Sequence, residues 1–243
     1  MSSASRERFA ELVRSPDCDV AEACLLIGCE VEPDLSVTDC LVELDVLAAT
    51  VTSKDVGGLQ RALGSFGGTP ADYEDLRSSL LHQVLRRRRG LPILLSVVWT
   101  EVAARAGLEA ASLGLPGHVL TLVGETVVDP FGGGTVVQAP HEPVLDPASL
   151  LLRVLTNIRA LTERQGRSLE TARTRLWATE LSLLLPRHPV ALRREQGELL
   201  LRLGSFTAGA TALEDYAEVV EDAAPDEAEA ARRQARLGRA RLN

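Results

Sequence analysis

The strongest constraint on the fold is a change in the spacing of apolar residues near the middle of this 243-residue chain. An apolar segment over 92–106 has helical character, opens with a proline that suits a first helical turn, and is stopped by Gly107. Short runs typical of β-strands follow at 110–113, 118–123 and 126–129. The sequence therefore predicts an α+β, mostly helical fold with a small antiparallel sheet.

Helical patterns also precede this central stretch. Apolar residues at helical spacing over 5–51 predict two or three helices, and a further helix is expected at 70–88. Between them, residues 53–69 contain five glycines, which predict a loop with room for one short helix. The first part of the chain is thus expected to place a helical bundle beside the small sheet.

After a polar stretch at 132–147, the sequence is helical to its end, and the change in composition near Asp146 predicts two domains, 1–146 and 147–243. The helices expected in the second domain cover 147–164, 168–184, 190–203, 206–221 and 225–242. Short Gly or Pro punctuation between them predicts antiparallel neighbours.

One helical pair in this tail is similar to a tetratricopeptide unit. The matching residues are Gly197, Leu200, Gly204, Phe206, Leu213 and Tyr216. Gly209 replaces the alanine that the repeat favours, and Pro225 comes about four residues late. We therefore expect an all-α, tetratricopeptide-like tail that carries one recognisable repeat.

Composition limits the function classes. The net charge of −8 argues against a general nucleic-acid binder or a binder of anionic membranes, because both need a positive field. No apolar run approaches the roughly twenty residues of a membrane span, and the first residues, MSSASRER, lack the apolar region of a signal peptide. We expect a cytoplasmic protein with no nucleic-acid or membrane partner.

The cysteines do not predict a metal site. They are Cys18, Cys24, Cys29 and Cys40. No two of them form a C-x-x-C pair and no histidine is nearby, so zinc and redox chemistry are not expected and reduced structural thiols are. No metal and no cofactor are predicted.

The most informative stretch is 85–134, where a glycine-introduced helix is followed by a strand with His118 and a strand with Asp129. If the hairpin turns at Gly124-Glu125, His118 lies opposite Phe131 and diagonal to Asp129 on one face of the sheet, which permits a hydrogen bond. In papain-like sites this order places a cysteine at a helix N-terminus, a histidine as its base and an aspartate that orients the histidine.

Specific motifs in this stretch resemble the SirB-one family of transglutaminase-like proteins. They are RRRGLP, LPGHVL and VVDPFGGG, together with CEVEPDLSVTDCLVELDVLA earlier in the chain. The resemblance implies a transglutaminase-like, papain-like core, and implies that His118 and Asp129 correspond to the family's histidine and aspartate. Arg77-Ser78-Ser79 replaces the usual asparagine-containing approach to the helix, and Val119 replaces a common phenylalanine.

The resemblance also implies that Pro92 stands where transglutaminases have their nucleophilic cysteine, because their G-x-C becomes Gly90-Leu91-Pro92. Proline has no nucleophilic atom, so cysteine-type catalysis is not expected. Ser96 lies one turn later on the same helix face and is the candidate substitute nucleophile, although a buried hydroxyl bonded to its own helix is the plainer interpretation.

Other residues are expected around this site. The resemblance assigns Gly90, Gly117, Pro130 and Phe131 to the cleft. Within the basic run at 86–89, Arg88 and Arg89 are candidates for contact with an anion, whereas the alternative is a favourable interaction of cations with a helix C-terminus.

Two functions remain open from the sequence. The first is a pseudoenzyme: a non-catalytic, bacterial protein-interaction or regulatory module that binds a protein, a peptide or a small acidic ligand. The second is a hydrolase or acyl-transfer enzyme in which His118, oriented by Asp129, activates water or Ser96. The absent cysteine favours the first.

Overall fold

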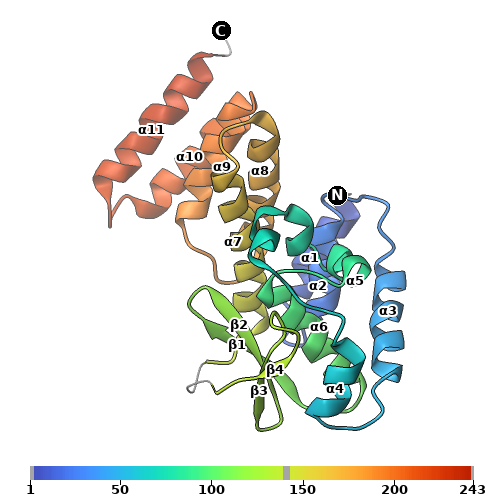
Figure 1. Ribbon diagram of the computed structural model, residues 1–243. Helices are drawn as coiled ribbons and strands as arrows, with labels where there is room; N and C mark the ends of the chain where they lie inside the picture. Colours follow the sequence, from blue (N-terminus) through green and yellow to red (C-terminus); the bar gives the residue numbers. More distant parts are fainter. Residues whose placement is uncertain (1–2, 139–142, 242–243) are drawn as a thin grey trace. The chain divides into compact units, whose positions relative to one another are not determined.

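The computed structural model describes residues 3–138 and 143–241, and it has the predicted mostly helical α+β architecture (Figure 1). The chain divides into two compact units, Met1–Val154 and Leu155–Asn243. Helix α7 (Pro147–Arg164) spans this division, and the predicted domain boundary near Asp146 lies at the start of that helix. Within the described residues, no helix combines the length and the apolar character needed to cross a bilayer.

The first unit opens with four helices: α1 (Ser3–Leu12), α2 (Val20–Gly28), α3 (Val37–Ala49) and α4 (Val56–Leu63). Local capping explains where the last three begin, because the side chains of Asp19, Ser36 and Asp55 each accept a backbone N–H of the first turn. The first three helices confirm the prediction for 5–51, and α4 is the short helix within the predicted loop.

The prediction of a single helix over 70–88 is wrong. Two 3-10 segments, η1 (Pro70–Glu74) and η2 (Leu76–Ser79), precede the short helix α5 (Leu81–Arg87). Asp75 and Leu80 have extended backbones that separate the segments, and the Asp75 carboxylate accepts the N–H of Arg77. Aspartate side chains here offer the backbone a competing partner, which apolar spacing does not register.

The sheet has four antiparallel strands in the order β1-β2-β3-β4. They are β1 (Ala110–Leu115), β2 (His118–Val123), β3 (Thr126–Asp129) and β4 (Thr135–Val136). Thr126 pairs with Val123 and Val128 with Thr121, which confirms the predicted turn and register. The two-residue strand β4 lies in the polar stretch at 132–147, where the sequence predicted no strand.

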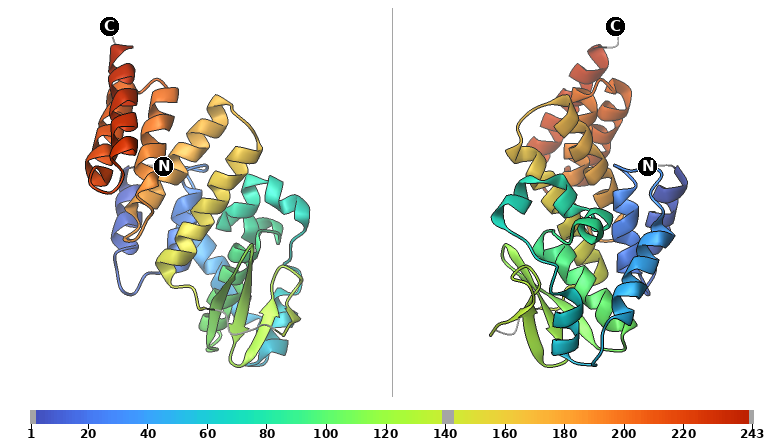
Figure 2. Two further views of the ribbon diagram at one scale, coloured as in Figure 1. Left: turned by 90° about the vertical axis from the view of Figure 1, so that its left-hand side faces the viewer. Right: turned by 45° about the vertical axis from the view of Figure 1, so that its right-hand side comes forward.

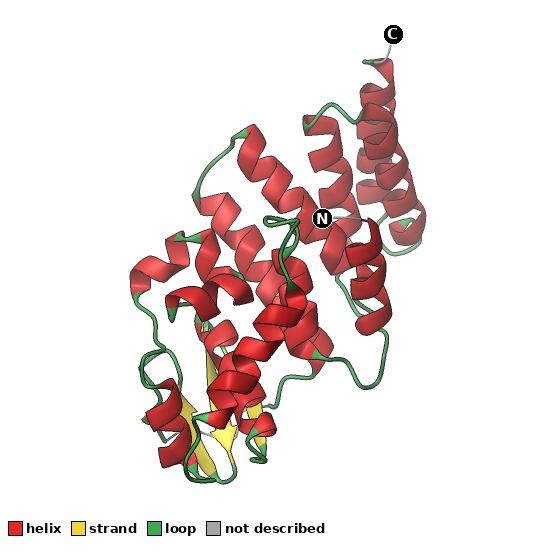
Figure 3. Cartoon of the chain, turned by 90° about the vertical axis from the view of Figure 1, so that its right-hand side faces the viewer, coloured by secondary structure: helices red, strands yellow, loops and turns green. Residues whose placement is uncertain are grey.

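The core of the first unit surrounds α6 (Pro92–Arg105), which packs against β1, β2 and α3 (Figure 2). Over residues 92–99 its side chains are apolar on every side except at Ser96, and Leu94, Val98 and Trp99 have no solvent exposure. A helix that is apolar all round has to be buried, and here the sheet and the surrounding helices bury it. Figure 3 shows the strands gathered into one small sheet within a largely helical chain.

The second unit is helical throughout its described part. After α7 come α8 (Leu169–Leu184), α9 (Ala191–Arg202), α10 (Phe206–Val220) and α11 (Pro225–Ala240). Each of these packs against the next along the chain. Gly197 and Gly209 lie where α9 and α10 approach, since a Cβ on Gly209 would be 2.8 Å from the Leu201 nitrogen. The predicted last residue of the final helix, Leu242, is outside the described residues.

Candidate functional site

The entrance to α6 is the segment that corresponds to the nucleophile motif. Pro92 is buried at the first helical position, where a missing N–H costs nothing. The Leu91 N–H donates to the Ser78 carbonyl at 2.9 Å. Gly90 packs so closely that a Cβ there would lie 2.5 Å from a Val84 methyl carbon. The entrance is therefore a tightly packed structural element, and Pro92 supplies no reactive atom to it.

The structure brings His118 and Asp129 together. The imidazole Nε2 lies 3.0 Å from Asp129 Oδ1, and the same oxygen accepts the backbone N–H of Phe131 at 3.0 Å. The hairpin register explains the contact, since it sets the two residues diagonally on one face of β2 and β3. Their side chains are 29% and 22% exposed, so the pair is reachable from solvent.

Two aromatic rings adjoin the pair. The Phe131 ring is 5.9 Å from the His118 ring and 6.1 Å from the Tyr73 ring, with edge-to-face geometry in both cases. The Tyr73 hydroxyl points to the Gly117 carbonyl at 3.5 Å. Burial raises the pKa of Tyr73, and the charge of Asp129 raises it further. We call His118, Asp129, Tyr73 and Phe131 the His118 cluster.

Backbone contacts tie this cluster to the entrance of α6. The Gly68 N–H donates to the Phe131 carbonyl at 3.0 Å, while the Gly90 N–H donates to the Gly67 carbonyl at 3.3 Å. A Cβ on Gly68 would overlap the Phe131 ring at 2.0 Å. The Gly67-Gly68 segment thus holds the glycine of the nucleophile motif and the aromatic neighbour of His118 in fixed positions. Pro130 is buried and lies between Asp129 and Phe131, at the start of the turn that follows β3.

Arg153 of α7 fixes the turn that precedes His118. Its guanidinium donates to the carbonyl of Leu115 and to that of His118, the latter at 3.1 Å. Gly117 lies within this turn and has a φ of +72°, a conformation that glycine adopts without strain. Sequence patterns marked Gly117 but gave no signal for Arg153 or Tyr73. Both come from elements distant in the sequence, and no local motif marks them.

Ser96 is placed apart from the pair. It has no solvent exposure, and its Oγ lies 2.8 Å from Ser112 Oγ and 2.7 Å from Thr121 Oγ1. Thr121 and His118 are three residues apart on β2, so their side chains point to opposite faces of the strand. None of the hydrogen bonds that Ser96 makes in the described chain involves His118 or Asp129.

All four arginines of the basic run have partners within the first unit. Arg86 forms a double hydrogen bond with Glu32, and Arg87 pairs with Asp75. The Arg88 guanidinium lies 4.6 Å over the Phe66 ring. Arg89 pairs with the buried carboxylate of Asp72 at 3.0 Å. Protein groups therefore already contact Arg88 and Arg89, the two residues considered for anion contact.

Comparison with known proteins assigns the class of this fold. Residues 42–157 match the family model described as the Transglutaminase-like superfamily, and this segment contains the entire His118 cluster and Arg153. The fold over residues 42–157, most of which lie in the first unit, is thus transglutaminase-like.

The chain is also similar to bacterial UPF0162 proteins. The chain is 32% identical over 177 residues to a UPF0162 protein of Xylella fastidiosa (strain Temecula1), a match that covers 62% of each chain. It is 28% identical over 179 residues to UPF0162 protein PA3419 of Pseudomonas aeruginosa, covering 61% of this chain and 66% of that one. The chain thus matches less than two thirds of the length of these relatives.

A more distant likeness extends to a eukaryotic protein. The chain is 29% identical over 126 residues to F-box only protein 21 of Mus musculus, a match that covers 42% of this chain and 20% of the mouse protein. No solved structure matches the chain.

Proposed function

We propose that this chain is a SirB-type, non-catalytic transglutaminase-like protein that acts as a protein-interaction or regulatory module. The observation that carries the proposal is Pro92, which is buried at the first position of α6, where the family resemblance sets the nucleophile. Acyl transfer by such sites needs a covalent step, and proline cannot form the bond. The hydroxyl of Ser96 is engaged with Ser112 and Thr121, which supports a non-catalytic role over a serine nucleophile.

The His118 cluster is the proposed contact of this module in the first unit. Binding requires no nucleophile, and a hydrogen-bonded imidazole beside two aromatic rings offers both polar and apolar contacts. Tyrosine, phenylalanine and histidine lose little conformational entropy when they bind, because their side chains have few rotatable bonds. The partner proposed here is a protein or a peptide, with a small acidic ligand as the minor case.

A second candidate function is hydrolysis. One observation favours it: Asp129 holds His118 by a 3.0 Å hydrogen bond, as an orienting carboxylate holds a general base. In that case His118 would activate a water molecule directly, without Ser96 and without a covalent intermediate.

The experiment compares tagged wild type, His118→Ala and His188→Ala, the last of which removes an imidazole from the second unit. Co-purification from native lysate with mass spectrometry reports retained proteins and small molecules. Hydrolysis of p-nitrophenyl acetate reports any general-base activity. We expect His118→Ala to lose a partner that wild type and His188→Ala retain, while all three share the same background hydrolysis.

A fall in hydrolysis of about a hundredfold in His118→Ala would support the enzyme function instead. Identical partners on all three proteins would remove the His118 cluster from the interaction.

A further inference from the structure

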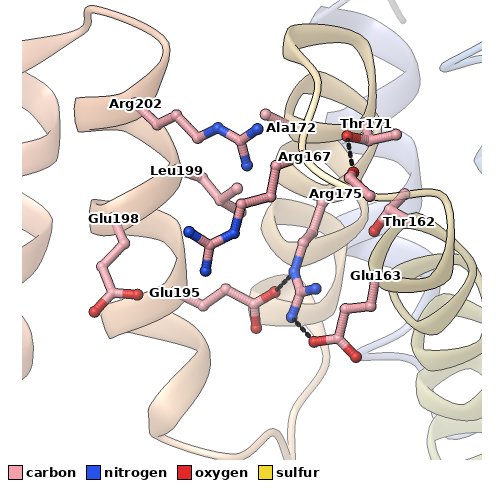
Figure 4. A pocket seen from close by; sticks show the side chains of 11 residues that line it. Thr162, Glu163, Arg167, Thr171, Ala172, Arg175, Glu195, Glu198, Leu199 and Arg202 are labelled. Carbon is pink, nitrogen blue, oxygen red and sulfur yellow. Dashed lines mark hydrogen bonds and ion pairs between the residues drawn. The ribbon is translucent and has the colours of Figure 1, made fainter.

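The second unit contains a cavity of about 540 Å³ between the last turn of α7, the start of α8 and the face of α9 (Figure 4). This volume lies within the range of small-molecule and peptide side-chain sites. Its lining is mainly polar, and each of the three helices contributes at least one charged side chain. The charged side chains of the lining that have no oppositely charged partner determine what the cavity can bind.

The inner charges of the cavity balance one another. Glu195 of α9 pairs with both Arg159 of α7 and Arg175 of α8, and Arg175 also pairs with Glu163 at 2.7 Å. Burial alone would raise the pKa of Glu195, but the hydrogen bonds from the two arginines outweigh it and lower that pKa. Two carboxylates and two guanidinium groups thus form a neutral network that holds the three helices around the cavity.

The outer charges do not balance. Arg167, in the turn before α8, and Arg202, at the end of α9, extend into the space between the two helices (Figure 4). Arg202 donates to the Ser168 carbonyl, which carries no charge, and in the described part of the chain neither arginine has a carboxylate partner. Glu198, the remaining acidic residue of the lining, pairs with Arg194 at 2.9 Å. Two uncompensated cations therefore face the cavity.

A second cavity of about 390 Å³ adjoins this site, and Glu198 and Arg202 line both cavities. Its apolar walls include Leu201 of α9, Phe206 of α10 and Leu237 of α11. Gln234 and Arg241 also line it, and the Arg241 guanidinium lies 5.8 Å over the Phe206 ring. Leu237 is 68% exposed, so its side chain is accessible to a ligand in this cavity. The cationic site and this partly apolar cavity thus share the side chain of Arg202.

We propose that these adjoining cavities bind an acidic peptide, with one carboxylate between Arg167 and Arg202 and a neighbouring apolar side chain against Leu201, Phe206 and Leu237. Guanidinium groups bind carboxylates through strong charge-assisted hydrogen bonds. A doubly charged phosphate fits less well, because the carboxylates of Glu163, Glu195 and Glu198 line the same cavity. The apolar neighbour distinguishes a peptide from a small free acid.

This inference goes beyond the proposed function, because it concerns only the second unit and requires nothing of His118. The overall charge of −8 repels an acidic peptide at long range, but this repulsion is screened beyond roughly 8 Å at physiological ionic strength. The local pair of arginines therefore decides the contact.

The test measures fluorescence anisotropy of a fluorescein-labelled, acetylated peptide that alternates Glu and Leu, titrated with the full chain. A second peptide has Gln in place of each Glu. Three variants are compared. One carries both Arg167→Gln and Arg202→Gln, and one carries Leu237→Ala. The control, Arg233→Gln, removes one exposed arginine of α11 outside both cavities. Circular dichroism and thermal melting verify that each variant is folded.

We expect the double variant and the Gln peptide each to weaken binding about tenfold or more, and Leu237→Ala to weaken it severalfold. Arg233→Gln should change it less than about twofold. Equal binding of both peptides, or unchanged binding by the double variant, would overturn the proposal. So would the absence of binding at millimolar protein concentration.

Two competitors and one further variant separate the remaining possibilities. Glutarate that matches the peptide in affinity would overturn the peptide assignment, and inorganic phosphate that displaces the peptide better than glutarate would overturn the carboxylate assignment. His118→Ala should bind the peptide as wild type does. If His118→Ala alone abolishes binding, the site in the second unit is wrong, whereas the interaction role of the His118 cluster stands.

Discussion

Asp72 provides the sharpest test of how the entrance to α6 is held. This carboxylate is 2% exposed, yet it accepts hydrogen bonds from the Thr69 N–H at 2.8 Å, from Ser78 Oγ at 2.9 Å and from Arg89 at 3.0 Å. Ser78 in turn accepts the N–H of Leu91, the residue before Pro92, through its carbonyl. Replacing Asp72 with asparagine keeps the shape of the side chain and removes its charge.

The expected cost follows from these partners. Breaking a fully buried ion pair costs about 3–5 kcal/mol, but Arg89 is 49% exposed and can turn to water, which lowers the figure. In the asparagine variant the hydrogen bonds at position 72 lose their charge assistance, and the new amide N–H₂ faces groups that are themselves donors. Together these two effects cost about 2–3 kcal/mol. We therefore expect Asp72→Asn to lower the free energy of unfolding at pH 7 by about 2–3 kcal/mol.

The pH dependence has a definite sign. Burial alone would raise the pKa of Asp72, but the hydrogen bonds from Arg89, Thr69 and Ser78 lower it below its ordinary value. The folded state therefore binds fewer protons than the unfolded chain. The stability that Asp72 contributes is present above its unfolded pKa of about 4 and is lost as the pH falls through the lower folded value. The deficit of Asp72→Asn should shrink below about pH 4.

Urea unfolding followed by circular dichroism measures this cost, with Asp45→Asn as the matched control. Asp45 is 65% exposed and pairs with Arg105, so its replacement should cost less than about 0.5–1 kcal/mol. The reasoning fails if Asp72→Asn unfolds with the free energy of wild type. It also fails if the deficit is unchanged between pH 7 and pH 3.5.

Two further predictions concern stability. Gly134→Ala places a methyl group at φ +79° and 2.4 Å from the Trp99 ring, so it should lower the free energy of unfolding by about 2–4 kcal/mol. Gly133→Ala, at φ +73° with open space around it, should lower it by about 1–2 kcal/mol. Equal losses in urea unfolding would contradict this reasoning. Burial lowers the pKa of His82, although Glu32 partly opposes the shift, so stability should fall from pH 7 to pH 5 as the unfolded chain protonates. Urea midpoints at pH 5, 6 and 7 should show this slope in wild type but less of it in His82→Gln.

Local patterns in the sequence determined much of the first unit. The proline at 92 and the glycine at 107 mark the ends of an apolar helix, and the structure places α6 there. Strand alternation and the turn at Gly124-Glu125 determine the register, which puts His118 and Asp129 on one face. Such features depend on residues close in the sequence or on strands joined by a two-residue turn, so spacing alone predicts them.

Tertiary structure decided what surrounds that pair. Tyr73 reaches it from a 3-10 segment, where side-chain carboxylates interrupt the helix that apolar spacing predicted. Arg153 reaches it from α7. These contacts join residues dozens of positions apart, so no local pattern encodes them.

The arginines show the same difference between what the sequence predicts and what tertiary structure decides. A run of arginines at 86–89 is conspicuous in the sequence, yet folding gives each one a partner within the first unit. Arg167 and Arg202 lie in no motif, and folding leaves both without a carboxylate partner in the described chain beside a cavity. Composition counts the charges in a chain, but three-dimensional packing determines which of them are neutralised and which remain available to a ligand.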